Sequence, residues 1–150
     1  MTRPYPTTAP PPTGGLAISY FTPLMAPTPV ATRLPQPSKT DDTVNGFLRV
    51  ESSGGFLRAD GLLYDVGVIL HAYAPNSAES AAEQLLATAL GWGGNAMGTT
   101  ITHPSSQVQY FVAFSRVSGA GVRLQDPLVN LTRFVGKVSW RLQGRYVASS

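Results

Sequence analysis

The amino-acid sequence predicts an α+β protein, with two helices packed on a mixed or antiparallel sheet of about four or five strands. Segments with alternating apolar residues are interleaved with two segments at helical spacing, and breaks rich in proline and glycine separate them. The chain has 150 residues, of which 43% are hydrophobic and 13% charged. This is enough apolar material for one core. We therefore expect a single domain over residues 14–150.

The first half of the chain predicts an arm, a helix and two strands. Residues 1–13 contain five prolines and predict an extended arm, because proline lacks the N–H that helices and inner strands use. Apolar residues at helical spacing predict a helix over 14–26, with Pro23 late in it. The sequence then predicts a short strand over 30–34 and a polar loop over 38–45. A second strand begins at Phe47 and stops at residues 52–55. The shape of residues 56–63 stays open.

The second half opens with the clearest strand, residues 64–74. Its residues are largely apolar at both alternating positions, so we expect it to be covered on both faces or to lie inside an assembly. A helix over about 77–90 follows, with Asn76 or Ser77 as its N-cap and Gly91 as its C-terminal glycine. Residues 91–106 then predict a loop, residues 107–117 a strand and residues 118–131 a long excursion.

The last predicted strand, residues 132–143, alternates strictly. Phe134, Val138, Trp140 and Leu142 share one face, and the other face carries Arg133, Lys137, Ser139, Arg141 and Gln143. This pattern is typical of a half-buried strand with a basic outer face, and we expect the aromatic side chains to face the core. The basic face is either a solvent surface whose cations protect a sheet edge, or a contact surface for a neighbouring chain or DNA.

Charge is distributed unevenly along the chain. Residues 107–150 carry six basic side chains and one acidic one, whereas residues 1–106 carry five basic and seven acidic ones. A basic end of this kind can meet nucleic acid or an acidic protein surface.

No pattern in the sequence indicates a metal site or a membrane span. His71 and His103 are far apart and lack the spacing of a helical zinc pair, so each is expected to be a packed or surface residue. The chain has no cysteine, which excludes disulfides and thiolate metal sites. No apolar run approaches the length of a membrane helix.

Catalytic and nucleotide-binding patterns are also missing. Gly91–Ala96 fits the dinucleotide pattern G-x-G-x-x-A, but it follows a predicted helix, whereas that fingerprint must follow a strand. Asp41 and Asp42 indicate a loop, and Glu79 and Glu83 indicate a solvated helix face. Neither pair has a partner that suggests acid–base chemistry. We therefore expect no enzyme activity and no cofactor.

Four stretches of the chain resemble the tail terminator proteins of long-tailed bacteriophages, similar to the lambda type and especially to those of actinobacteriophages. They are the early helix leading to VATRLP, the stretch GFLRVESSGG, the run DVGVILHAYAPNSAESAAEQLLATAL, and the final pair VQYFVAFSRVSG and TRFVGKVSWRLQG. The resemblance covers roughly residues 14–145 and rests on the pattern of elements. The proline-rich arm has no counterpart in it.

The resemblance implies a small α+β subunit of which six copies form a ring at the head-proximal end of the tail tube. Such a ring ends tube polymerisation and offers the surface that joins the head. Its implied partners are further copies of itself, the tail tube protein below and a head–tail connector or stopper protein above, and DNA passes through the lumen without sequence-specific binding. The implied location is the virion, and the host cytoplasm during assembly, with no membrane partner and no chemistry catalysed.

The candidate interface or lumen residues are Arg58, Arg123, Arg133, Lys137 and Arg141. The arm, residues 52–63 and residues 118–131 are the segments expected to contact neighbouring subunits. Three other hypotheses stay open: another neck or connector protein, a nucleic-acid-binding module that uses the basic residues 116–145, and a small enzyme that uses His71 or His103.

Overall fold

The computed structural model describes residues 11–33, 46–57, 63–125 and 131–145. Most of the predicted arm and the predicted loop over 38–45 lie outside these residues. The first helix begins at Thr13, one residue earlier than expected.

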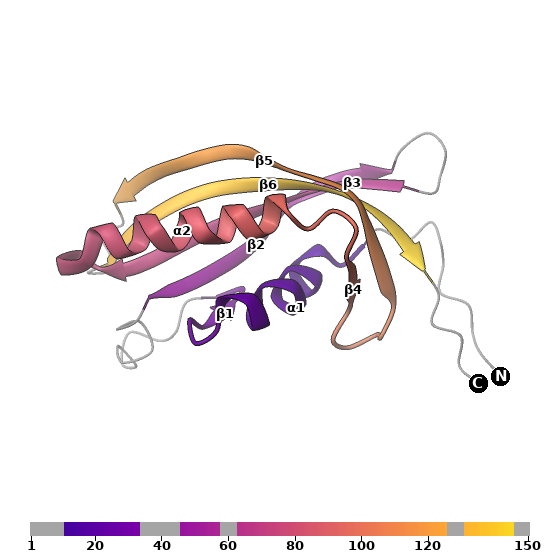
Figure 1. The fold of residues 1–150 in the computed structure, drawn as a ribbon, viewed down its shortest axis with the longest axis horizontal. Helices are drawn as coiled ribbons and strands as arrows, with labels where there is room; N and C mark the ends of the chain where they lie inside the picture. The colour runs from indigo at the N-terminus through magenta and orange to yellow at the C-terminus, as the bar shows by residue number, and fades with distance from the viewer. Residues whose placement is uncertain (1–10, 34–45, 58–62, 126–130, 146–150) are drawn as a thin grey trace.

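The fold combines two helices with a curved mixed sheet (Figure 1). Both helices lie on the same side of the sheet, whose strands β5 and β6 arch over α1. The elements are, in chain order, α1 (Thr13–Met25), β1 (Val30–Ala31), β2 (Phe47–Leu57), β3 (Leu63–Pro75), the 3₁₀ turn η2 (Asn76–Ala78), α2 (Glu79–Gly94), β4 (Thr100–Thr102), β5 (Gln109–Gln125) and β6 (Leu131–Arg145). The α+β class is thus as predicted.

The sheet has six strands in the order β1-β2-β3-β6-β5-β4, so the expected number of four or five is too low. All neighbours are antiparallel except β1 and β2, which are parallel. The basic strand β6 lies between β3 and β5. Its cations therefore do not protect a sheet edge, so this one of the two interpretations of the basic face of residues 132–143 is wrong.

Two strands run further than the sequence predicted, because β-bulges carry them through turn-like residues. Strand β2 does not stop at residues 52–55: its register with β3 shifts between Ser52 and Gly55, and Gly54 takes a φ of +84° that favours glycine. Strand β5 continues to Gln125 with three such irregularities. Most of the predicted excursion over 118–131 is therefore strand.

Helix α2 begins and ends differently from the prediction. Its N-cap residue is Ala78, which has no side-chain oxygen, so the predicted cap at Asn76 or Ser77 is wrong. Gly91 lies inside the helix, which continues to Gly94 and ends at Asn95. Residues 91–94 are thus helix, and residues 100–102 form β4, where the sequence predicted a loop.

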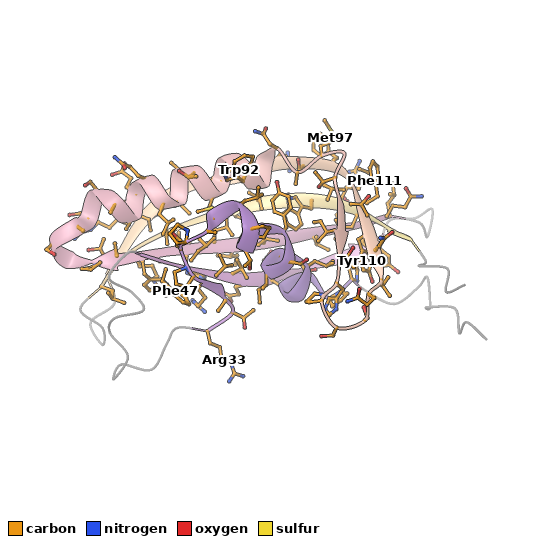
Figure 2. All side chains as sticks on the ribbon, turned by 60° about the horizontal axis from the view of Figure 1, so that its bottom comes forward. Arg33, Phe47, Trp92, Met97, Tyr110 and Phe111 are labelled. Atoms are coloured by element: carbon orange, nitrogen blue, oxygen red, sulfur yellow. The ribbon has the colours of Figure 1, made fainter. Side chains whose placement is uncertain are left out.

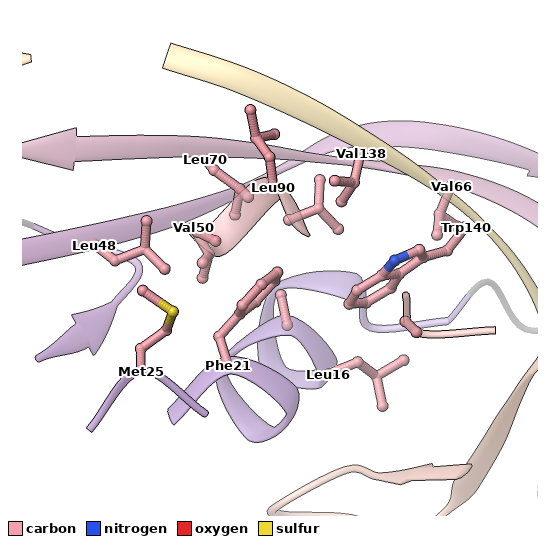
Figure 3. Close-up of a cluster of buried hydrophobic side chains, with 14 of the residues drawn as sticks. Leu16, Phe21, Met25, Leu48, Val50, Val66, Leu70, Leu90, Val138 and Trp140 are labelled. Carbon is pink, nitrogen blue, oxygen red and sulfur yellow. The ribbon is translucent and has the colours of Figure 1, made fainter. Parts of the chain in front are cut away.

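The core lies between the two helices and the sheet (Figure 3). Trp140 of β6 is almost fully buried, and its ring packs edge-on against Tyr20 and stacks with Phe21, both of α1. Its Nε1–H donates a hydrogen bond of 2.9 Å to the carbonyl oxygen of Gly93 in α2. One side chain thus joins both helices to the centre of the sheet.

Both sides of the sheet end in strands that are only partly paired within the described residues. Strand β4 pairs with β5 at Gln109–Phe111, and Val112 is hydrogen-bonded to Gly98 and Thr99, so β5 beyond Val112 pairs with β6 alone. Strand β1 pairs with β2 only at Leu48 and Arg49, so β2 beyond Arg49 pairs with β3 alone. Among the described residues, two stretches of strand edge therefore have no partner strand, one on each side of the sheet.

The two helical glycines Gly91 and Gly93 give a matched stability test. A Cβ at Gly93 would lie 2.7 Å from Cγ1 of Val138, whereas nothing lies within 4 Å of a Cβ at Gly91. Gly91→Ala should raise the free energy of unfolding by about 0.5–1 kcal/mol, because alanine favours the helix. Gly93→Ala should lower it by about 1 kcal/mol or more, because overpacking costs more than the helix gains. Urea denaturation followed by tryptophan fluorescence measures both. A loss of stability in Gly91→Ala would contradict its position inside α2.

Candidate functional site

The helices cover one face of the sheet, and the register assigns residues to this face and to the opposite one, here called the open face. The open face is exposed around Lys137 and Arg141 but buries Phe47, His71 and Tyr73 at its other end. Val138 and Trp140 contact α2 at Gly93, so the alternate residues of β6 point to the open face. Arg133, Lys137 and Arg141 therefore share that face, as the sequence predicted. They recur every four residues, which places successive Cα atoms about 13 Å apart.

Arg123 lies on the opposite side of the sheet. It faces Phe134 across β5 and β6, and its Nε is 2.8 Å from Oε1 of Glu79 in α2. The sequence grouped Arg123 with the cations of β6, and the structure separates them. Arg58 lies outside the described residues.

A groove of about 520 Å³ crosses the open face over strands β2, β3, β6 and β5. Its polar side chains are Ser53, Asp65, Arg116, Lys137, Ser139 and Arg141. The Nε of Arg141 donates to Oδ1 of Asp65 at 2.9 Å, and its guanidinium carbon lies 5.9 Å from the ring centre of Phe114. The groove is thus basic, with three cations, one carboxylate and an aromatic ring.

Two glycines and the bulge in β2 leave room for this groove. At Gly67, which faces Ser139 in β6, a Cβ would collide with Ser53 Oγ and with Cε of Lys137. Lys137 therefore lies across β3 at this position. At Gly55 in the bulge, a Cβ would collide with the carbonyl oxygen of Asp65. A larger residue at Gly67 would fill the space that Lys137 occupies, and a larger residue at Gly55 would push β2 away from the backbone of β3.

A second polar cluster lies on the open face around His71, which is 6% exposed. Its Nε2 lies 2.8 Å from Oε2 of Glu51. Arg49 is opposite His71 in the register, and Arg133 places its guanidinium carbon 6.0 Å from the ring centre of Tyr73. Arg49 Nε, His71 Nδ1 and Arg133 Nε are all buried without a hydrogen-bond partner.

His71 is neutral near pH 7, because its pKa is lowered from 6.5. Burial is the main cause, and the positive charges of Arg49 and Arg133 lower the pKa further, while the hydrogen bond to Glu51 and the charge of Glu51 oppose the change. The neutral imidazole therefore donates its Nε2–H to Glu51. His71 is a packed residue, as expected.

His103 has a structural role in a turn. Its Nδ1 accepts hydrogen bonds of 3.2 Å from the backbone N–H groups of Ser105 and Ser106. Its ring also fills the space beside Gly15 of α1, where a Cβ would not fit. The two histidines therefore lie on different sides of the sheet and form no common site. The described residues contain no cluster of three or more His, Asp or Glu that could hold a metal ion.

The remaining sequence candidates form no site within the described chain. Gly91–Gly94 complete α2, so the G-x-G-x-x-A match has no strand before it. Glu79 and Glu83 are exposed on α2, as expected, and Glu79 pairs with Arg123. Asp41 and Asp42 lie outside the described residues.

Sequence reasoning missed the groove residues that come from β2, β3 and β5. The sequence assigned no role to Phe114, which is 45% exposed and lies in the groove beside Arg141. Phe114 and Arg116 are two residues apart, so alternation in β5 already placed them on one face. Gly67 and Asp65 had no local signal, because their role depends on which strand pairs with β3.

Comparison of the sequence with protein-family models and with curated proteins finds no match. In the described part of the chain, no helix is long and apolar enough to cross a membrane.

The lowered pKa of His71 predicts how stability changes with pH. The unfolded chain takes up a proton near pH 6.5, whereas the folded chain resists it. His71 therefore contributes to the free energy of unfolding above pH 6.5, and this contribution is lost as the pH falls through the lower pKa of the folded state. Between about pH 7.5 and about pH 5.5, the wild type should lose more free energy of unfolding than His71→Gln, measured by urea denaturation.

Glu51→Gln serves as the control for this experiment. It removes the carboxylate that raises the pKa of His71, so the loss of stability should extend to lower pH than in the wild type. Identical pH dependence in the wild type and His71→Gln would contradict the neutral, buried imidazole.

Proposed function

We propose that this protein is a structural subunit of a long-tailed phage that forms a ring, of six copies as the resemblance implies, at the head-proximal end of the tail tube. The ring ends tube polymerisation and offers the surface to which the head is joined. The protein acts by assembly and catalyses no reaction. It works in the virion and assembles in the host cytoplasm.

The observation that carries this proposal is the placement of exposed apolar side chains. Among the described residues, the exposed large hydrophobic side chains are those of Trp92, Met97, Phe114, Val117, Val122 and Leu124. Trp92 lies in the last turn of α2, Met97 follows that helix, and the other four lie along β5. Figure 2 shows Trp92 near the middle of the molecule and Met97 further along, after the end of α2. These side chains are spread along the β5 side of the sheet, and exposed apolar residues along one side of a subunit are typical of protein–protein contact surfaces.

The partly paired strands β5 and β2 support a closed ring in particular. They lie on opposite sides of the sheet, so the β5 side of one copy and the β2 side of the next are different surfaces. Contacts between two different surfaces of one subunit generate rings when the rotation closes. The bulged segment 52–57 and most of the segment 118–125 lie at these two sides, which is where the sequence predicted neighbour contacts.

The direct test is electron microscopy of phage tail tubes incubated with the purified protein. Rings at one end only, on tubes that stop lengthening, are expected. Bare tubes that continue to grow would contradict the proposal and favour a connector on the head side.

A charge on the β5 side should prevent assembly without unfolding the subunit. Val122 is 58% exposed, so Val122→Glu should change the free energy of unfolding by less than about 0.5 kcal/mol. The same change should abolish or strongly reduce ring formation on tubes, because a carboxylate would be buried in an apolar contact.

Ala87→Glu is the matched control, since it places the same charge at an exposed position of α2. It should leave ring formation unchanged. If both variants and the wild type form rings on tubes equally well, β5 is not part of the contact surface.

A further inference from the structure

We propose that the basic groove on the open face binds single-stranded nucleic acid, with phosphates at Arg116 and Lys137 and a base stacked at Phe114 and Arg141. This inference goes beyond ring formation and does not depend on it, because every residue of the groove belongs to one subunit.

The groove has more positive than negative charge, and two of its cations are unpaired. Arg141 is engaged by Asp65 at 2.9 Å. Arg116 and Lys137 have no ion-pair partner among the described residues, although both line the same groove. Unpaired cations that share a groove provide a site for a polyanion, and phosphate groups release counterions when they bind there.

The aromatic ring distinguishes this groove from a simple basic patch. Phe114 is 45% exposed, and the guanidinium of Arg141 lies over its ring at 5.9 Å. Exposed aromatic rings and arginine planes are the surfaces on which unpaired bases stack. A duplex hides the faces of its bases, and an acidic peptide has no such face, so the ring favours a single strand over either.

The dimensions and polar groups of the groove fit a short piece of such a strand. Its volume of about 520 Å³ lies within the range of sites for small organic ligands. The hydroxyl group of Ser53 lies on its wall and can donate to phosphate or base oxygens. The Ser139 hydroxyl donates to Ser118 Oγ at 2.9 Å and offers an acceptor to the groove. Gly67 keeps the centre of the groove free, since a Cβ there would displace Lys137.

The exposed acidic residues of α2 do not oppose this binding, because they lie on the other side of the sheet. Glu79 pairs with Arg123 on the helix side. Beyond the groove, Arg49 and Arg133 lie on the same side of the sheet, but their Nε atoms are buried and Nη2 of Arg49 lies 4.0 Å from Oε2 of Glu51. The proposed binding therefore rests on the groove residues alone.

The test is fluorescence anisotropy of a short labelled oligothymidylate and of a duplex of the same length, titrated with the full chain at several salt concentrations. The single strand is expected to bind more tightly than the duplex. Replacing Phe114 by leucine keeps an apolar side chain but removes the ring, and should weaken single-strand binding about fivefold or more.

Charge-removing variants separate the groove from the overall charge of the protein. Arg116→Gln and Lys137→Gln should each reduce the slope of log K against log salt concentration by about 0.7, as expected for one lost phosphate contact. Arg123→Gln removes the same charge on the helix side and should leave affinity and slope unchanged. Circular dichroism checks that each variant is folded.

Several results would overturn the proposal. They are the absence of saturable single-strand binding at low salt, equal weakening by Arg116→Gln, Lys137→Gln and Arg123→Gln, and unchanged binding in Phe114→Leu. Tighter binding of the duplex, or equally effective competition by polyglutamate, would assign the groove to duplex DNA or to an acidic protein instead.

Discussion

The packing of Trp140 is the interaction on which the rest of the structure depends. It lies on β6, between β3 and β5, and the rings of Tyr20 and Phe21 pack against it from α1 while its indole N–H is bonded to α2. An indole buried at a helix contact must find an acceptor, and the carbonyl oxygen of Gly93 supplies it. Both helices are thereby held on one face, which leaves the alternate residues of β6 to form the open face.

This division into two faces also separates the charges. On the helix side, Arg123 is paired with Glu79. On the open face, Arg116 and Lys137 share a groove with the paired Arg141 and Asp65. The face opposite the helices therefore carries Arg116 and Lys137, which have no ion-pair partner among the described residues.

Elements with a clear periodicity were predictable from the sequence. The strict alternation of residues 132–143 placed Arg133, Lys137 and Arg141 on one face, and the apolar run of residues 64–74 predicted β3. The composition of Ser52–Gly55 and of Ser118–Gly121 is typical of turns, and only pairing with a neighbouring strand keeps these residues extended. In the same way Gly91–Gly94 are poor helix formers, yet the contact of Gly93 with Val138 and Trp140 holds them in α2. The groove could not be predicted from the sequence, because strand order and register alone bring Asp65, Arg116 and Gly67 close to Lys137.

The irregular register of β5 has a consequence for aggregation. A long, flat strand with a free edge and exposed apolar side chains is a template for uncontrolled pairing into fibrils. The three irregularities between Val112 and Val122 interrupt the regular row of N–H and C=O groups and bend the strand. Only a partner strand with a matching curvature can follow such an edge, so the irregular register protects the protein from amyloid-like growth.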